Sequence, residues 1–280
     1  MTKTVTPNLI KEFENFLIEE EKAHATIEKY MRDIRTFFDW TLGGEIDKRK
    51  VLLYKEYLKE NLAPASVNSV LSSLNSFFEF NNWHDLKVKM LKIQRQIFAQ
   101  KDKELTKAEY KRLLDAAKGK KNERLYLLMQ TICASGIRVS ELQHITVEAV
   151  RQRKATINSK GKMRVVILPK DLCKMLIQYT KEQKIESGSV FVTKTGKPLD
   201  RSTIWKMMKA LCESAAVDSK KVFPHNLRHL FARTYYSLQK DIVRLADILG
   251  HSSINTTRIY TMETGDIHRR QIQMLGLLRL

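Results

Sequence analysis

The stretch LADILGHSSINTTRIY occupies residues 245–260. Gly250 interrupts the apolar pattern and predicts the end of a helix, because glycine readily adopts the left-handed conformation that closes a helix C-terminus. His251 then lies in a turn, and either of the two serines after it can cap a second short helix. Tyr260 lies near the end of that helix. The stretch therefore predicts a histidine and a tyrosine held in fixed relation by two short helices.

A second polar segment, CASGIRVSEL at residues 133–142, follows an apolar and therefore buried helix over residues 123–135. A Ser-Gly turn breaks this helix and delivers Arg138 beside free backbone amides, an arrangement suited to binding a phosphate. Glu141 lies close enough in sequence to orient the guanidinium. An ordinary structural ion pair at this spacing is the alternative.

A third segment, FPHNLRHLFA at residues 223–232, predicts a helix that begins at Pro224. His225 and Arg228 share one face of it, which places an acid–base group beside a second cation. His229 lies about 100° around the helix from Arg228, so we expect it to pack.

The rest of the C-terminal part is mixed but mostly helical. Thr106 and Glu109 form a capping box that begins a helix. Residues 155–168 alternate in polarity around Ser159-Lys160-Gly161-Lys162, which predicts a β-hairpin with a Lys-Gly turn. Further helices are expected to begin near residues 170, 200, 224, 241 and 253.

Residues 1–85 predict a bundle of four helices, because apolar side chains recur there at spacings of three and four. The last helix begins at Pro64, and its other face carries serine and asparagine. Such small side chains can hydrogen-bond phosphates, although a plain polar surface explains them equally well. The candidate phosphate contacts on this face are Ser69, Ser72 and Ser73.

The length of 280 residues fits two domains, and the charge is divided unequally between them. The whole chain carries +19, from 50 Lys and Arg against 31 Asp and Glu. Residues 1–85 carry −3, residues 86–103 carry +5 and residues 104–280 carry +17. A chain this basic is expected to bind a polyanion such as nucleic acid. We interpret residues 86–103 as an interdomain linker, whose basic residues do not form one helical stripe. The candidate DNA contacts here and in the hairpin are Lys87, Lys89, Lys92, Arg95 and Arg164.

Several classes of protein are disfavoured. No apolar run reaches the ~20 residues of a membrane span, and the first residues lack the apolar stretch of a signal peptide. Cys133, Cys173 and Cys212 are scattered, without metal-ligand spacing, which favours a reducing compartment and a cytoplasmic protein. The phosphate-binding loop of nucleotide hydrolases is absent. We therefore expect no metal and no cofactor.

Two arginines, two histidines, a lysine and a tyrosine can be selected from the three segments and the hairpin: Arg138, Arg228, His225, His251, Lys160 and Tyr260. This set suffices to attack a phosphodiester without a metal ion. A tyrosine hydroxyl is a slow nucleophile near neutral pH, because its unperturbed pKa is about 10. Two guanidiniums on the non-bridging oxygens would stabilise the phenolate and the charge-rich transition state.

The motifs ASGIRVSEL, HNLRHLFA and LGHSSINTTRIYT, in this order, give the chain a specific likeness over nearly its whole length. It resembles the tyrosine recombinases of the phage-integrase family, closest in layout to the compact Xer-type members. The resemblance implies that Tyr260 is the nucleophile and that Arg138 and Arg228 hold the scissile phosphate. It further implies that Lys160 protonates the leaving 5′-oxygen, that His225 moves protons to and from the tyrosine, and that His251 hydrogen-bonds the phosphate. Glu141 would support Arg138 and His225.

The hairpin departs from the family pattern. Its turn is shorter than usual, which leaves Lys162 as an alternative general acid to Lys160. Ser135 stands where threonine is common in the family, a mild change. Neither difference disrupts the implied active site.

The resemblance also implies an architecture: a helical, SAM-like core-binding domain over residues 1–85, the linker, and a catalytic domain over residues 104–280. The fold class is therefore mainly α with a small β-hairpin, without an additional N-terminal arm-binding domain. The tail from about residue 262 to 280 would dock as a helix into a neighbouring protomer, closing a homotetramer or heterotetramer on two DNA duplexes. A tail folded back on its own domain is the alternative.

The implied substrate is double-stranded DNA with inverted-repeat core sites, cut and rejoined through a Holliday junction, with an accessory directionality factor as a further partner. The expected location is the cytoplasm, at the nucleoid. A type IB topoisomerase and a DNA-binding regulator with a vestigial site are the competing functions.

Overall fold

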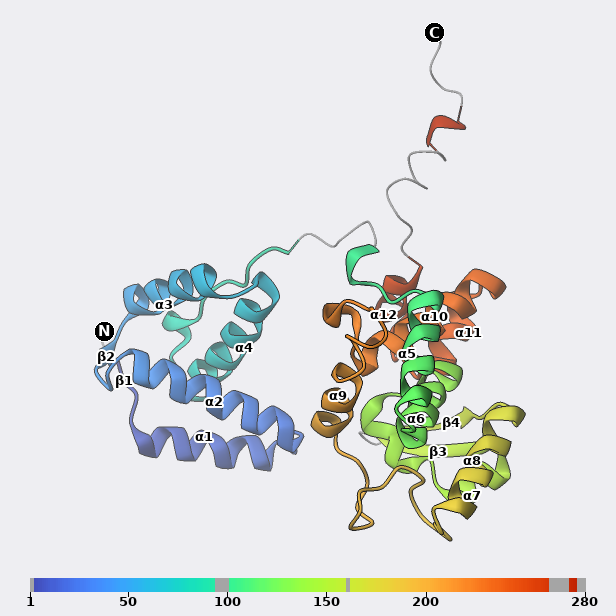
Figure 1. Cartoon of the computed structure of the whole chain (residues 1–280). Helices are drawn as coiled ribbons and strands as arrows, with labels where there is room; N and C mark the ends of the chain where they lie inside the picture. The colour runs from blue at the N-terminus through green and yellow to red at the C-terminus, as the bar shows by residue number, and fades with distance from the viewer. Residues whose placement is uncertain (1–2, 94–100, 160–161, 262–271, 276–280) are drawn as a thin grey trace. The chain divides into compact units, whose positions relative to one another are not determined.

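The structure is a computed structural model that describes residues 3–93, 101–159, 162–261 and 272–275. The chain divides into two compact units, Met1–Arg95 and Gln96–Leu280 (Figure 1). Both units are mainly helical, and each contains one small two-stranded antiparallel sheet. The predicted fold class is confirmed.

The N-terminal unit contains the four predicted helices. They are α1 (Pro7–Glu19), α2 (His24–Trp40), α3 (Lys48–Asn61) and α4 (Pro64–Phe80). Their apolar faces meet in an aromatic core in which Phe13, Phe37 and Phe77 are fully buried. Two short strands, β1 (Lys3–Thr4) and β2 (Glu45–Ile46), pair beside this bundle and were not predicted.

The segment after α4 packs onto the N-terminal unit. It contains a turn of 3₁₀ helix, η1 (His84–Leu86), in which Leu86 is buried, and then an extended stretch. Asn75 exchanges two hydrogen bonds with the backbone of Val88, and Asn68 does the same with Leu91, at 2.7–2.9 Å. The first part of the predicted linker therefore belongs to the N-terminal unit, because two asparagine side chains hold it against α4.

The C-terminal unit contains the predicted helix starts and the predicted hairpin. Its longer helices are α5 (Lys107–Gly119), α6 (Glu123–Ser135), α8 (Lys170–Glu182), α9 (Arg201–Lys209), α10 (Pro224–Gln239) and α11 (Ile242–Leu249). The shorter ones are η2 (Lys101–Lys103), η3 (Val139–His144), α7 (Val147–Gln152), η4 (Ser219–Lys221), α12 (Ile254–Thr257) and η5 (Arg258–Tyr260). The hairpin pairs β3 (Lys154–Ser159) with β4 (Lys162–Ile167), and the capping box of Thr106 and Glu109 is present.

Helix α6 is the centre of the C-terminal core. It packs against α5, α8, α9 and α10, and its apolar side chains are buried along its length. It ends at Gly136, whose φ of +65° is the left-handed conformation typical of a residue that closes a helix. The end of this buried helix at Gly136 therefore fixes the position of Arg138, two residues further along the chain.

No helix in the described part of the chain is both long and apolar enough to cross a membrane. The three cysteines are free thiols.

Candidate active site

Three arginines from different elements converge on the end of helix α11. The donor–acceptor pairs are Arg164 Nη1 with the carbonyl of Ile248 (2.7 Å), Arg228 Nη2 with Leu249 (2.7 Å) and Arg138 Nη2 with Gly250 (3.3 Å). The last carbonyls of a helix lack partners within the helix and carry the negative end of its dipole. The end of α11 therefore holds three guanidiniums close together.

Arg138 is fixed by Glu141, which is buried. Oε1 of this carboxylate accepts a hydrogen bond from Arg138 Nη1, and Oε2 accepts one from the Arg138 backbone amide, both at 2.9 Å. Burial by itself would raise the pKa of Glu141, but the hydrogen bonds from Arg138 and the charge of Arg164 lower it below its usual value. The carboxylate is therefore ionised near neutral pH and orients the guanidinium.

Arg228 is almost completely buried, with 1% of its surface exposed. Its Nη1 donates to the carbonyl of Gly136, and its Nη2 lies 3.1 Å from His251 Nε2. Burial, together with the neighbouring Arg138, lowers the pKa of Arg228 to about 10, so it remains charged at neutral pH. The other ring nitrogen of His251 lies 2.8 Å from Thr257 Oγ1, which fixes the orientation of the imidazole.

Three histidines surround this cluster, and each has a lowered pKa. Burial and then the charges of Arg228 and Arg138 lower the pKa of His251 to about 4. Burial and then His225 lower the pKa of His229 to about 3. Burial and Arg228 also lower the pKa of His225. All three imidazoles are therefore neutral near pH 7.

Tyr260 lies in η5 and is buried, with 4% of its surface exposed. Its ring meets His229 edge-on, with centroids 4.8 Å apart, and lies nearly parallel to His251 at 6.0 Å. His229 also contacts His225, at 4.5 Å between ring centroids. His229, expected only to pack, thus connects His225 with Tyr260.

A hollow of about 340 Å³ opens beside the cluster, and Arg138, His225 and Arg228 contribute to its lining. Arg201 and Trp205, four residues apart on α9, line it as well. Arg201 also contributes to the lowered pKa of His225. Sequence reasoning missed both α9 residues. The available signal was an exposed Arg and Trp on one face of a short basic helix.

The hairpin residues are described only in part. Lys160 lies outside the described residues, and for Lys162 the structure describes only the backbone, which pairs with Ser159 at the start of β4. Arg164, predicted to contact DNA, has protein partners in the structure. Its side chain is only 14% exposed and is bonded to Glu141 and to α11, because the alternation of β4 turns it inward.

The proposed DNA-contact face of α4 needs one correction. Ser73 is fully buried, donates to Asp33 and accepts from Lys29, so it cannot contact DNA. Ser69 is exposed and Ser72 is partly exposed.

The basic residues after α4 differ in their surroundings. Lys87 forms an ion pair with Glu79. Lys89 and Lys92 are exposed, and Arg95 lies outside the described residues.

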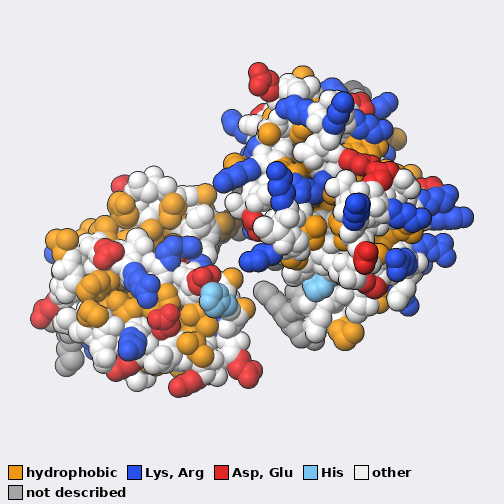
Figure 2. Space-filling view, turned by 60° about the horizontal axis from the view of Figure 1, so that its bottom comes forward, with side chains coloured by type: hydrophobic (Ala, Val, Ile, Leu, Met, Phe, Trp, Pro, Cys, Tyr) orange, Lys and Arg blue, Asp and Glu red, His pale blue; other side chains and the backbone are white. Residues whose placement is uncertain are grey.

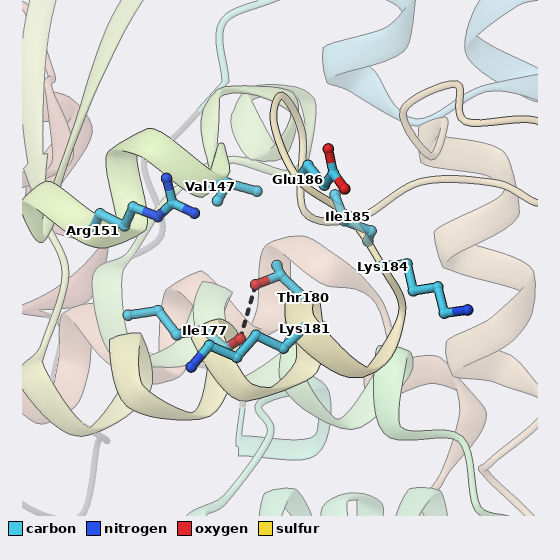
Figure 3. Close-up of a pocket in the computed structure, with 8 residues that line it drawn as sticks. All are labelled: Val147, Arg151, Ile177, Thr180, Lys181, Lys184, Ile185 and Glu186. Atoms are coloured by element: carbon cyan, nitrogen blue, oxygen red, sulfur yellow. Dashed lines mark hydrogen bonds between the residues drawn. The ribbon is translucent and has the colours of Figure 1, made fainter.

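Figure 2 shows many Lys and Arg side chains over the visible face of the C-terminal unit, whereas acidic and basic side chains are mixed on the N-terminal unit. A second hollow, of about 570 Å³, lies between α7, α8 and the segment after α8 (Figure 3). Val147, Ile177 and Ile185 line it together with three exposed cations, Arg151, Lys181 and Lys184. None of the candidate catalytic residues lines this second hollow.

Comparison with known proteins identifies the family. The model of the phage integrase N-terminal SAM-like domain matches residues 10–84, and that of the phage integrase family matches residues 103–265. The chain belongs to the phage integrase family. The predicted function, site-specific recombination by a tyrosine recombinase, is thereby confirmed, and neither the topoisomerase nor the regulator is favoured.

Similar members of the family include Xer recombinases. The tyrosine recombinase XerA of Thermococcus kodakarensis is 32% identical over 279 residues, which is 95% of each chain. The tyrosine recombinase XerD of Listeria innocua is 29% identical over 92% of this chain and 94% of its own. The crystal structure of XerA recombinase matches 99% of this chain and 100% of its own at 26% identity, with a TM-score of 0.52. A lambda integrase dimer bound to a core site shares the fold, with a TM-score of 0.75 at 17% identity over 95% of this chain and 97% of its own.

Proposed function

We propose that this recombinase cleaves duplex DNA with Tyr260, forming a 3′-phosphotyrosyl bond and releasing a 5′-hydroxyl. The observation that carries the proposal is the convergence of Arg138, Arg228 and His251 at the end of α11, with Tyr260 beside them. Attack of the released 5′-hydroxyl of a second duplex on the phosphotyrosyl bond then rejoins the strands and passes through a Holliday junction.

The two arginines would bind the non-bridging oxygens of the scissile phosphate. Their fixed positions favour a transition state that carries more charge than the ground state, and each such donor is worth roughly 3–4 kcal/mol of barrier. His251 would hydrogen-bond the same phosphate; because its Nε2 accepts from Arg228 Nη2 in this structure, donation from that nitrogen requires the other tautomer of the ring. A neutral His225 would accept the phenolic proton, either directly or through His229, whose ring contacts both.

The leaving 5′-oxygen needs a proton, and a hairpin lysine would supply it. Lys160 is the first candidate because it occupies the tip of the Lys-Gly turn, and Lys162 is the alternative. A 5′-bridging phosphorothiolate leaves without a proton, so it separates the two residues. Cleavage by Lys160→Ala should recover on this substrate. Recovery of Lys162→Ala in its place would assign the acid to Lys162.

The burial of Tyr260 adds a step to the proposed reaction. With 4% of its surface exposed, the tyrosine cannot reach a phosphate in a duplex, so α12 and η5 must move when the complex with DNA forms. The segment is short and has one buried residue in each of its two helices, so the free-energy cost of moving it is small.

A suicide substrate with a nick near the cleavage site tests the proposal. The native chain should form a covalent protein–DNA adduct, and Tyr260→Phe should bind the same DNA without forming it. Tyr236→Phe, which removes a hydroxyl from α10, is the matched control and should react normally. An adduct with Tyr260→Phe would contradict the assignment of the nucleophile.

DNA binding is proposed to depend on the basic C-terminal unit, on Lys89 and Lys92, and on the exposed Ser69 and Ser72. Replacing a lysine that contacts a phosphate should reduce the slope of log affinity against log salt by about 0.9. We expect this change for Lys92→Ala and not for Lys181→Ala, which removes a lysine at the second hollow (Figure 3). Equal slopes for both variants and the native chain would contradict the contact.

We further propose that four protomers assemble on two duplexes by exchange of the tail over residues 262–280. A lambda integrase tetramer bound to a Holliday junction shares the fold at 18% identity, with a TM-score of 0.73. Ile272 and Leu275 are exposed apolar side chains in the described part of the tail, as a docking helix requires. Deletion of residues 262–280 should leave cleavage of a single site intact and abolish the tetramer on two sites in native mass spectrometry. An intact tetramer would favour a tail folded on its own domain.

The biological task belongs to the same proposal: integration or excision of a mobile element, or resolution of dimers, at inverted-repeat core sites in the cytoplasm. A second recombinase in a heterotetramer and a directionality factor are the partners to test. Reconstitution with the purified chain and a substrate bearing its core site decides whether either is needed.

A further inference from the structure

Arg164 connects the hairpin to both sides of the catalytic cluster. Its Nη2 lies 2.5 Å from Glu141 Oε2, and its Nη1 lies 2.7 Å from the carbonyl of Ile248. Glu141 in turn holds Arg138, and Ile248 lies in the last turn of α11, just before His251. One side chain on β4 therefore contacts both the carboxylate that orients an arginine and the helix end that positions a histidine.

Arg164 is also tightly packed against Gly250. A Cβ on Gly250 would lie 2.3 Å from Arg164 Cδ and 2.9 Å from Nε, so the arginine occupies the space that any other residue at position 250 would need. The neighbouring strand positions Met163 and Val165 are exposed, whereas Val166 is buried. Arg164 thus occupies the inward face of the hairpin, where an unpaired charge would be costly.

The charge balance in this group favours phosphate binding. Glu141 alone with Arg138 would form a neutral pair, and a neutral pair attracts a phosphate weakly. With Arg164 sharing the carboxylate, the three side chains carry a net charge of +1. Arg164 therefore fixes the carboxylate and also leaves Arg138 with more uncompensated charge for an anion.

We propose that Arg164 is a positioning residue for the recombination reaction, acting through Glu141 on Arg138. This inference rests on the proposed function, in which Arg138 holds the scissile phosphate. Because β4 follows the turn that carries Lys160, Arg164 also fixes one strand of the hairpin against the end of α11. Arg164 itself touches neither the phosphate nor the tyrosine.

The test compares Arg164→Met, which keeps an unbranched apolar stem and removes the guanidinium and its charge, with Arg164→Lys. Arg151→Met is the matched control, because Arg151 is exposed at the second hollow and contacts none of the catalytic residues. Adduct formation on the nicked substrate should fall about 10- to 100-fold in Arg164→Met, the range found when a partner that orients a metal ligand is lost. Arg164→Lys should recover part of this loss, and Arg151→Met should react like the native chain.

A methylphosphonate at the scissile position supplies a readout that a general structural role would not change. A methylphosphonate lacks the negative charge of the phosphate, so its cleavage depends less on charge stabilisation by Arg138. The rate ratio between native chain and Arg164→Met should shrink on this substrate, and Arg138→Ala should behave in the same way. In the Glu141→Gln background, Arg164→Met should add little, because the two residues act in series.

Three results would overturn the proposal. The first is an equal loss on phosphate and methylphosphonate, with a lower melting temperature, which means that Arg164 only stabilises the fold. The second is recovery of Arg164→Met on the phosphorothiolate, which means that it serves the hairpin lysine instead. The third is full additivity with Glu141→Gln.

Failure of the proposed function is recognised separately. In that case the native chain itself forms no Tyr260-dependent adduct. The positioning role can then still be tested by DNA binding, measured in the Tyr260→Phe background. Without further change, this variant should bind DNA with a phosphate at the scissile position more tightly than DNA with a methylphosphonate there. Adding Arg164→Met should abolish this difference in affinity. A preference that Arg164→Met leaves unchanged would overturn the role.

Discussion

Replacing Gly136 by alanine should destabilise the C-terminal unit through two separable effects. Gly136 has a φ of +65°, and holding alanine in the left-handed region costs about 1 kcal/mol. The new Cβ would also lie 2.5 and 2.6 Å from two ring carbons of Phe231, which packs against the apolar cluster that contains Leu245 and Leu249. Relieving such a contact in a packed core costs about 1–3 kcal/mol.

Gly188 provides the matched control, since its φ is +74° and a Cβ there would meet nothing within 4 Å. Gly188→Ala should therefore show the backbone cost alone. The totals are about 1 kcal/mol for Gly188→Ala and roughly 2–4 kcal/mol for Gly136→Ala. For a unit of this size these correspond to falls in melting temperature of about 2–4 °C and roughly 4–16 °C.

Differential scanning calorimetry on the full chain measures both changes. Tryptophan fluorescence in a Trp40→Phe, Trp83→Phe background, in which Trp205 is the remaining tryptophan, identifies the transition of the C-terminal unit. Phe231→Leu should reduce the cost of Gly136→Ala by making room for the methyl group. Equal melting temperatures for Gly136→Ala and Gly188→Ala would refute the reasoning. DNA cleavage should also fall in Gly136→Ala alone, because the carbonyl of Gly136 binds Arg228.

Three further predictions concern other parts of the molecule. Asn75→Ala removes two hydrogen bonds to the backbone of Val88 and should lower the unfolding free energy of the N-terminal unit by about 1–3 kcal/mol, whereas Ser76→Ala should not. The pKa values of about 4 for His251 and about 3 for His229 lie below the usual 6.5, so the unfolded chain takes up protons first as the pH falls. The contribution of these histidines to stability should therefore be constant near pH 7 and decline from about pH 6.5 towards 4 in urea titrations, with a shallower decline in His229→Gln. Cleavage of the nicked substrate should persist in EDTA, since the proposed chemistry uses guanidiniums; loss of activity that added Mg²⁺ restores would contradict it.

Local patterns predicted the elements well. The apolar run before Gly136, the capping box at Thr106 and the Pro at position 224 each predicted a helix that the structure contains. These signals depend on neighbours within one or two turns, so a single sequence contains them in full. The motifs around Arg138, Arg228 and Tyr260 identified the family for the same reason.

Contacts between distant segments were missed. Arg164 was assigned to the DNA surface because its charge suggested a phosphate, yet its partners Glu141 and Ile248 lie on other elements. The period of two along β4, with Val166 buried, was the one local hint that Arg164 faces inward. The prediction for Ser73 missed a distant contact in the same way, since its hydrogen-bond partner Asp33 lies on another helix.

Three arginines donate hydrogen bonds to the carbonyls at the end of α11, and this arrangement limits which sequence changes the active site can tolerate. Inserting or deleting one residue in α11 would turn its last carbonyls by about 100° and detach all three guanidiniums at once. Point substitutions on the outer face of α11 leave these three hydrogen bonds in place, but a change in the length of the helix does not. The loop around Gly188 and Gly196, where a Cβ meets nothing within 4 Å, imposes no such register. Members of the family with intact activity should therefore differ in length at that loop and keep α11 free of gaps.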